Sequence, residues 1–326
     1  MKILVIGGSG FVGSRLISLL NDYDIRNIDK RDSAFYSNIT RIGDITDINS
    51  LHIDNNIDTV VLLAAEHKDN VSPKKLYYDV NVEGTKNVLN LMDKNEINNL
   101  IFTSSVAIYG LNKRNPKENH AHDPFNDYGK SKWQAENVIF EWYNKNPQKR
   151  KVTIIRPTVI FGERNRGNVY NLLKQICSGK FIMIGNGLNK KSMAYVGNVA
   201  AFIKKCVDLK AKGYNVYNYA DKPDFDMRKL VLTIEKKMKI SIPSFSIPYF
   251  IGLSAGYFFD FFSFIMNKKF SISSIRIKKF CATTQFNSDK AHKLFKSPYS
   301  IEEGLNKTLD HEFINPKDDN VLFYSE

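Results

Sequence analysis

Short apolar runs alternate with longer amphipathic stretches through the first half of the chain. The short runs are rich in β-branched residues, as in strands that are buried on both faces, and the stretches between them repeat apolar residues at helical spacing. The expected strands are residues 2–7, 24–29, 57–65, 99–105 and 151–157. The expected helices are residues 11–21, 73–93 and 128–144.

This alternation predicts an α/β fold, namely a doubly wound parallel sheet of the Rossmann type. Parallel strands need crossover helices on both faces, which the pattern supplies up to about residue 160. The rest of the chain mixes short elements with more glycine and proline. We therefore expect an NAD-binding domain at 1–160 and a smaller C-terminal substrate lobe at 161–326, interleaved across a soft boundary.

The first expected turn between a strand and a helix is rich in glycine, within the sequence VIGGSGFVGSRL. Glycines there permit a tight turn and let backbone N–H groups approach a pyrophosphate at the helix N-terminus. A structural glycine turn is the alternative, but the position between strand and helix favours dinucleotide binding. The expected contacts are Gly7, Gly10, Phe11, Val12 and Gly13.

The choice of dinucleotide depends on Asp29, which closes the second expected strand. A carboxylate there binds the hydroxyls of the adenosine ribose and repels a 2′-phosphate, which favours NAD. Lys30 and Arg31 follow directly and could accommodate the extra phosphate of NADP, but we favour a solvated loop as their explanation. We predict NAD as the cofactor, with Lys30 beside it.

The chain carries a formal charge of +13, which suggests an anionic partner such as a membrane surface or a phosphorylated substrate. The basic residues are spread along the sequence without a nucleic-acid-binding motif, so we expect no nucleic-acid partner. The three cysteines are far apart and the histidines lack ligand spacing, so we expect no metal site. Reduced thiols fit a cytoplasmic protein.

Tyr128 and Lys132 lie four residues apart, so a helix places both on one face. We expect the lysine ammonium to favour the phenolate and lower the pKa of Tyr128, which would make it a base near neutral pH. Ser105 ends an expected strand upstream and would hydrogen-bond the reacting oxygen. A buried tyrosine and a surface lysine are the plainer alternative.

The order of these motifs resembles the extended short-chain dehydrogenase/reductase family, the NAD-dependent nucleotide-sugar epimerases and dehydratases. The resemblance covers nearly the whole chain and includes the segments LLAA, VNVEGT, FTSSVAIYG, YGKSK and IIRPTVIFG. It implies that Ser105, Tyr128 and Lys132 are catalytic, and it implies a homodimer. The further cofactor contacts that it implies are Asp44, Ile45, Leu63, Ala64, Ala65, Ser104, Tyr128 and Lys132.

Val106 and Ala107 occupy the positions where dehydratases and decarboxylases of this family resemble one another in carrying acidic residues. We therefore expect 4-epimerisation or simple ketone reduction instead of elimination. Within the family, three long segments resemble the subgroup that acts on N-acetylglucosaminyl-diphospho-undecaprenol for O-antigen synthesis. A UDP-sugar 4-epimerase, an NAD(P)-dependent 4-ketosugar reductase and a non-catalytic nucleotide sensor remain alternatives.

Several polar residues are candidates for contact with the diphosphate-linked sugar. Glu66 and His67 follow a strand end where cofactor and sugar would meet, and Arg164 and Arg166 lie in a loop that suits phosphate oxygens. Lys191 is a further candidate for the diphosphate. For each of them a solvated or hydrogen-bonded loop is the competing interpretation.

The segment 247–279 combines an aromatic helix with a basic run. Its expected polar stripe is narrow, at Gly256, Asp260, Ser263 and Asn267, and phenylalanines cover the remainder. The basic run that follows is Lys268, Lys269, Arg276, Lys278 and Lys279. We expect a membrane-contacting segment at the cytoplasmic face of the inner membrane, with an internal helix of the substrate lobe as the alternative.

Overall fold

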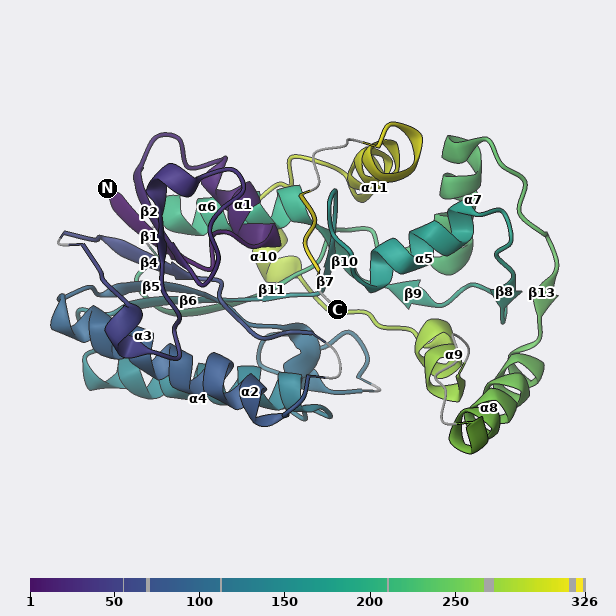
Figure 1. The fold of residues 1–326 in the computed structure, drawn as a ribbon, viewed down its shortest axis with the longest axis horizontal. Helices are drawn as coiled ribbons and strands as arrows, with labels where there is room; N and C mark the ends of the chain where they lie inside the picture. The colour runs from purple at the N-terminus through teal and green to yellow at the C-terminus, as the bar shows by residue number, and fades with distance from the viewer. Residues whose placement is uncertain are drawn as a thin grey trace.

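A seven-stranded parallel sheet forms the centre of the computed structural model, which describes residues 1–54, 56–68, 71–111, 113–209, 211–266, 273–316 and 321–324. The strands lie in the order β11-β6-β5-β4-β1-β2-β3 (Figure 1). Their bounds are β1 Lys2–Ile6, β2 Asp24–Asp29, β3 Thr40–Ile42, β4 Thr59–Leu62, β5 Asn99–Thr103, β6 Lys151–Pro157 and β11 Gly213–Tyr219. The predicted doubly wound parallel sheet is confirmed.

Helices cover both faces of this sheet (Figure 1). On one face α1 (Phe11–Ile17) packs beside α6 (Val196–Leu209), and on the other α3 (Gly84–Lys94) packs beside α4 (Asp127–Lys145). The buried residues of β1 alternate between the two cores, since Ile3 and Val5 join the first and Leu4 and Ile6 the second. A strand buried on both faces has no polar side, which is why it reads as a continuous apolar run.

The sequence analysis did not predict two strands of the sheet, β3 and β11. Both lie at its edges, where one flank and part of a face meet water, so neither needs a continuous apolar run. The sequence of β11, GYNVYNY, is interrupted by two asparagines and contains one aliphatic residue, Val216. Its pairing with β6 brings the chain back to the central sheet long after residue 160.

A third core lies beside the sheet and contains the aromatic and aliphatic residues of the C-terminal half, among them Phe161, Tyr195, Phe225 and Leu305. The strands around it are β7 Val159–Phe161, β8 Met183–Ile184, β9 Lys190–Lys191, β10 Met193–Tyr195, β12 Phe225–Asp226 and β13 Ser246–Ile247. The helices are α5 Asn168–Cys177, α7 Met227–Met238 and α11 Ile301–Leu309. The remaining described helices are α2 Lys75–Tyr78, α8 Tyr249–Met266, α9 Ser274–Cys281 and α10 Asp289–Leu294.

Helix α8 lies at the periphery, beside α9 (Figure 1). Of its residues only Gly252 and Gly256 are buried, so the alternative of an internal helix is wrong. Two residues of the predicted polar stripe face α9: Gly256 lies against Ser274, and Asp260 accepts a hydrogen bond from the backbone N–H of Ser274 at 3.1 Å. Within the part of the chain that the structure describes, α8 is the one helix long and apolar enough to cross a membrane by length and composition.

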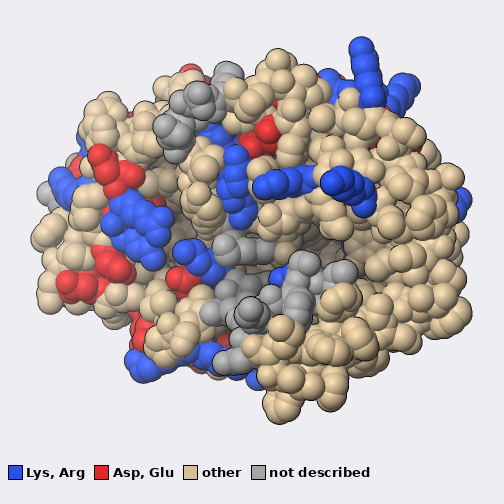
Figure 2. Space-filling model, turned by 45° about the vertical axis from the view of Figure 1, so that its right-hand side comes forward, with Lys and Arg blue, Asp and Glu red and all other residues tan. Residues whose placement is uncertain are grey.

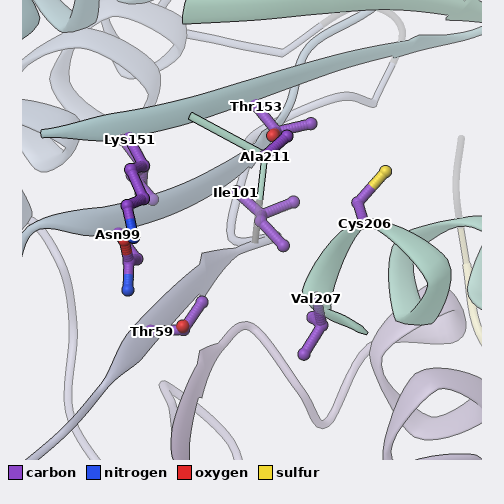
Figure 3. Close-up of a pocket in the computed structure, with 9 residues that line it drawn as sticks. Thr59, Asn99, Ile101, Lys151, Thr153, Cys206, Val207 and Ala211 are labelled. Carbon is purple, nitrogen blue, oxygen red and sulfur yellow. The ribbon is translucent and has the colours of Figure 1, made fainter. Parts of the chain in front are cut away.

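A small cavity of about 20 Å³ lies at the amino ends of β4, β5 and β6. Figure 3 shows its lining, with Thr59, Asn99 and Lys151 at the first positions of these strands and Cys206 from α6. Burial raises the pKa of the Cys206 thiol to about 12, so this thiol is unreactive near neutral pH. The cavity has room for about one water molecule and lies at the sheet edge opposite the predicted site.

A buried ion pair ties α4 to β6. The guanidinium of Arg156 donates to both carboxylate oxygens of Glu136, at 2.9 Å and 2.6 Å, and their side chains are only 4% and 5% exposed. Arg156 also donates to the hydroxyl of Tyr109 at 2.7 Å. This network fixes the helix that carries Tyr128 and Lys132 against the sheet.

Replacing one partner of this pair should destabilise the fold strongly. We expect Arg156→Met to lower the free energy of unfolding by about 3–5 kcal/mol, because it leaves the Glu136 carboxylate buried without its partner. Urea unfolding measures this. Arg26→Met is the matched control in an exposed pair with Asp24 and Asp54, and it should cost less than about 1 kcal/mol. Equal effects of the two substitutions would contradict this account.

Candidate active site

The glycine-rich turn joins β1 to α1 at the carboxyl edge of the sheet. Gly7 has a φ of +91°, and a Cβ atom on it would lie 2.4 Å from the backbone nitrogen of Ala64. A Cβ atom on Gly13 would lie 2.5 Å from the carbonyl oxygen of Gly7. Glycine is therefore required at both positions, for backbone conformation at the first and close packing at the second.

Two side chains at the end of β2 hold this turn. The side-chain oxygen of Asn27 accepts from the N–H of Gly8 at 2.9 Å, and the carboxylate of Asp29 accepts from the N–H of Ser9 at 3.0 Å. Burial raises the pKa of Asp29, against the opposing effect of these backbone bonds. The sequence prediction missed Asn27, although a fully buried asparagine in an apolar strand is a signal for such a contact.

The turn fits a dinucleotide pyrophosphate. Gly10 is the N-cap of α1 and provides no side chain to cap it, so the first N–H groups of the helix point toward a position suited to an anion. Phe11 and Val12 are the residues that carry them. At the carboxyl end of β5, the buried hydroxyl of Ser104 has no hydrogen-bond partner among the described residues. Such an orphaned group is consistent with a ligand at this edge.

The other predicted cofactor residues lie along the same edge of the sheet. Leu63, Ala64 and Ala65 follow β4 directly. The carboxylate of Asp44 accepts from the backbone and hydroxyl of Thr46, and the buried Ile45 fills the space next to Gly84. The remaining candidate, Lys30, is exposed.

Helix α4 begins at the site because Asn126 caps it, accepting from the N–H of Gly129 at 2.9 Å. One turn later the Lys132 ammonium is almost fully buried and donates to the carbonyl of Thr103 at 2.7 Å. It also lies 4.6 Å from the centre of the Phe102 ring. Burial lowers the pKa of Lys132 to about 7.

Tyr128 and Ser105 meet at the same place, since the Ser105 side chain lies close enough to the Tyr128 phenol to affect its pKa. The structure corrects one prediction about this tyrosine. Burial raises the pKa of Tyr128, and the nearby Ser105 hydroxyl only partly opposes that effect. The expected lowering by Lys132 is wrong for this structure, because the lysine ammonium is directed at the Thr103 carbonyl.

Asn81 joins the strand end after β4 to helix α4. Its side-chain oxygen accepts from the N–H of Glu66, and its amide donates to the carbonyl of Glu66 and the hydroxyl of Ser131, all at 2.9 Å. The buried Glu66 carboxylate accepts from the backbone N–H groups of His67 and Lys68. Glu66 thereby shapes this loop, and His67 lies exposed next to it.

The three predicted diphosphate contacts have partners within the chain. The Arg166 guanidinium pairs with the buried carboxylate of Glu312 at 2.6 Å, and the N–H of Arg164 donates to the same carboxylate at 2.6 Å. The Lys191 ammonium donates to the carbonyls of Lys279 and Ala282, and burial lowers the pKa of Lys191 to about 8. All three substrate contacts stay predictions.

Among the described residues, no group of three or more His, Cys, Asp or Glu side chains is placed to hold a metal ion. The polar residues of the site are instead a turn of backbone N–H groups, two hydroxyls, a phenol and a buried ammonium. This set suits an anionic dinucleotide and proton transfer at a hydroxyl.

Comparison with known proteins agrees with this geometry. The model of the NAD dependent epimerase/dehydratase family matches residues 3–220. The chain belongs to this family. The cofactor prediction of NAD and the predicted family are therefore confirmed, and the seven-stranded sheet is the family's Rossmann fold.

Individual family members resemble the chain to different degrees. An Escherichia coli O157:H7 protein, N-acetyl-alpha-D-glucosaminyl-diphospho-ditrans,octacis-undecaprenol 4-epimerase, is 59% identical, and the match covers 100% of this chain and 99% of the relative. A decarboxylating sterol-4-alpha-carboxylate 3-dehydrogenase of Candida albicans is 28% identical, and the match covers 95% of this chain and 97% of the relative. The structure of the Bifidobacterium longum UDP-glucose 4-epimerase with NAD+ and UDP superposes with a TM-score of 0.74 at 21% identity. The superposition covers 97% of this chain and 99% of that chain.

The buried lysine of this family member should make stability depend on pH. Lys132 releases its proton near pH 7 in the folded chain but near pH 10.5 when unfolded. Between these values the unfolded chain binds more protons, so the free energy of unfolding rises with pH, by at most about 1.4 kcal/mol per unit. We expect Lys132→Met to remove this rise of the free energy of unfolding with pH, as measured by urea unfolding of the protein without NAD.

Lys130→Met is the matched control, since Lys130 lies on the exposed face of the same helix. It should follow the pH dependence of the wild type. If Lys132→Met and the wild type gave parallel stability curves from about pH 7 to 10, the burial of the ammonium would be disproved.

Proposed function

We propose that the chain is an NAD-dependent 4-epimerase that interconverts N-acetylglucosaminyl- and N-acetylgalactosaminyl-diphospho-undecaprenol for O-antigen synthesis. The observation that carries this proposal is the 59% identity to the E. coli enzyme over essentially the full length of both chains. The similarity extends through the C-terminal half, which would hold the substrate. The cluster of Ser105, Tyr128 and Lys132 supports the chemistry.

In this proposal Tyr128 removes the proton from the C4 hydroxyl and later returns it. The Ser105 hydroxyl lies close to the Tyr128 phenol, which suits hydrogen bonding of both groups to the same substrate oxygen. NAD, when bound, accepts a hydride from C4 and gives it back to the other face of the ring. The sugar ring therefore rotates between the two hydride transfers, while the site holds the rest of the substrate.

Lys132 lies beside the position proposed for this exchange. Its pKa of about 7 leaves it partly protonated near neutral pH, and its ammonium donates to the carbonyl of Thr103 at 2.7 Å. It does not lower the pKa of Tyr128 from there. We therefore assign Lys132 one role, contact with the nicotinamide ribose.

The residues after Ser105 argue against elimination or decarboxylation assisted by a carboxylate. Val106 is buried, and the N–H of Ala107 donates to the Ser105 hydroxyl at 3.1 Å. Neither side chain exchanges protons. Reversible oxidation of one hydroxyl does not need a carboxylate at these positions, because the phenol can carry the single proton.

Lys191 is our candidate for the diphosphate. Its ammonium is half-buried and bonded to two backbone carbonyls, at 2.7 Å and 2.6 Å, which are weaker partners than phosphate oxygens. Arg166 already has a carboxylate partner in Glu312, so we rank it below Lys191. Binding of the substrate would exchange the carbonyl contacts of Lys191 for a charged one.

A turnover assay with defined substrates tests the proposed function. The purified protein should convert N-acetylglucosaminyl-diphospho-undecaprenol to the galacto epimer, detected by chromatography of the released sugar, without net consumption of NAD. Turnover of UDP-N-acetylglucosamine alone would favour a UDP-sugar 4-epimerase instead. Consumption of one reduced cofactor for each product would favour a ketosugar reductase.

Tyr128→Phe is the companion variant in this assay. It should lose about a hundredfold or more of the activity and still bind NAD, since only the phenolic proton carrier is removed. Tyr143→Phe changes a tyrosine near the other end of the same helix and should retain activity. Equal turnover by Tyr128→Phe and wild type would exclude Tyr128 from the reaction.

We further propose that α8 attaches the protein to the cytoplasmic face of the inner membrane. Phe258, Phe261 and Phe264 are all exposed by more than half of their surface, the last by 86%. Burying such rings in the membrane interface is favourable. Figure 2 shows a broad area without charged side chains over the lower right-hand part of this face. A homodimer remains a prediction that rests on the resemblance to the family.

The charges next to α8 suit an anionic bilayer better than a second protein. Arg276, Lys278 and Lys279 are exposed on α9, which packs against α8, and Lys278 donates to the Tyr257 hydroxyl of α8 at 2.8 Å. Aromatic residues beside cations are typical of interfacial segments on anionic lipid. The other basic residues of this stretch, Lys268 and Lys269, and the polar Asn267 lie outside the described residues.

Vesicle binding tests this attachment. The wild type should co-sediment with vesicles of phosphatidylglycerol and phosphatidylcholine, and weakly with phosphatidylcholine alone. Phe261→Ser combined with Phe264→Ser should weaken binding about tenfold or more, because two rings no longer leave water. Leu232→Ser, at an exposed apolar position on α7, is the control and should bind as the wild type does.

Two results would contradict membrane attachment. The first is equal binding by the double variant and the wild type. The second is absence of vesicle binding together with a solution dimer that the same two substitutions dissociate. That outcome would assign the α8 surface to an interface between two copies of the chain.

A further inference from the structure

The last described residues, 321–324, return to the middle of the molecule, close to β7 (Figure 1). Phe323 pairs there with the loop that follows β7. Its N–H donates to the carbonyl of Arg164 at 2.9 Å, and its carbonyl accepts from the N–H of Arg166 at 2.8 Å. These two bonds form a parallel bridge between Asn165 and Phe323. We call residues 321–324 the C-terminal strap.

The loop beneath the strap is itself firmly held. Its other side contacts the buried carboxylate of Glu312, which accepts from the N–H of Arg164 and pairs with the guanidinium of Arg166, both at 2.6 Å. His311 adds a further contact to the same carboxylate at 2.9 Å. The strap therefore docks on a loop whose position is fixed from below.

The ring of Phe323 lies on Phe11, with the ring centres 5.9 Å apart and the planes inclined by 43°. Phe11 is the first residue of α1 and directly follows Gly10, the N-cap. Behind Phe11 is Gly162, where a Cβ atom would lie 3.3 Å from the Phe11 ring. The Phe11 ring thus contacts both the strap and the glycine at the start of the loop.

Phe11 connects the strap to the dinucleotide-binding turn. Its backbone N–H is one of those that α1 presents without a capping side chain. Because the Phe11 ring and this N–H belong to the same residue, packing of the ring restrains the backbone at the start of α1. A ring contact between two phenylalanines adds about 0.5–1.5 kcal/mol beyond its buried area. Loss of this contact therefore loosens the first turn of α1.

We infer that Phe323 is a positioning residue, and that the C-terminal strap holds the glycine-rich turn closed on the pyrophosphate and slows release of NAD. The reason for slow NAD release rests on the proposed function. A 4-epimerase must return a hydride to the sugar from which it came, so its cofactor has to stay bound between the two transfers. An enzyme that releases its cofactor in every cycle has no such need.

Release of bound NAD tests the strap directly. Protein loaded with radiolabelled NAD is mixed with excess unlabelled NAD, and the loss of label is followed with time. Phe323→Ala, and a chain ending at residue 320, should both release NAD about five- to tenfold faster than the wild type, as expected for loss of one aromatic contact. Tyr324→Ala, at a neighbouring ring that is 60% exposed, should release it at the wild-type rate.

Hydrogen–deuterium exchange of the protein without NAD gives a second readout. The peptide that covers residues 7–17 should exchange faster in Phe323→Ala, whereas peptides from β5 and α4 should not change. Thermal midpoints should stay close to that of the wild type, since the strap is peripheral to the three cores. Faster exchange across the whole chain would indicate general destabilisation and overturn the inference.

Unchanged NAD release in both Phe323→Ala and the shortened chain would also overturn it. Failure of the proposed function has a different signature, because the wild type would then bind NAD and yield no epimer from either sugar donor. The rate of NAD release and the exchange of residues 7–17 are measured without a sugar, so they decide the role of the strap in either case.

Discussion

The hydrogen bond from the buried Lys132 ammonium to the carbonyl of Thr103 is the contact on which the site depends. It fixes helix α4 at the carboxyl end of β5, and this places Tyr128 one turn away, beside Ser105. Burying an ammonium is costly, and the fold meets that cost with a carbonyl and an aromatic ring. The ion pair of Arg156 with Glu136 holds the next turn of the same helix.

The parallel sheet explains why distant motifs meet. Every strand ends at the same edge, so the glycine turn after β1, the hydroxyls after β5 and the start of α4 converge there. Each of these features is local in sequence: a turn that excludes side chains, a capped helix, or a spacing of four residues. For this reason the five inner strands of the sheet, the glycine-rich turn and the approach of Ser105, Tyr128 and Lys132 to one another were predictable from the sequence, whereas the catalytic roles of these residues stay predictions.

The features that escaped prediction depend on contacts between distant segments. Burial raises the pKa of Tyr128, and the direction of the Lys132 ammonium is set by a strand that lies far away in sequence. Strand β11 lacks an apolar run because it lies at the sheet edge. The ion pair of Arg166 with Glu312 joins residues separated by most of the substrate half of the chain. The contact of Phe323 with Phe11 joins residues separated by nearly the whole chain.

The account attributes inversion at C4 to oxidation and return of the same hydrogen within one closed site. Turnover of N-acetylglucosaminyl-diphospho-undecaprenol carrying deuterium at C4 measures this most directly. The account predicts that the galacto product keeps its deuterium at C4 in ordinary water, with none passed to added free cofactor. Replacement of the deuterium by solvent hydrogen, or its appearance in the free cofactor pool, would contradict it.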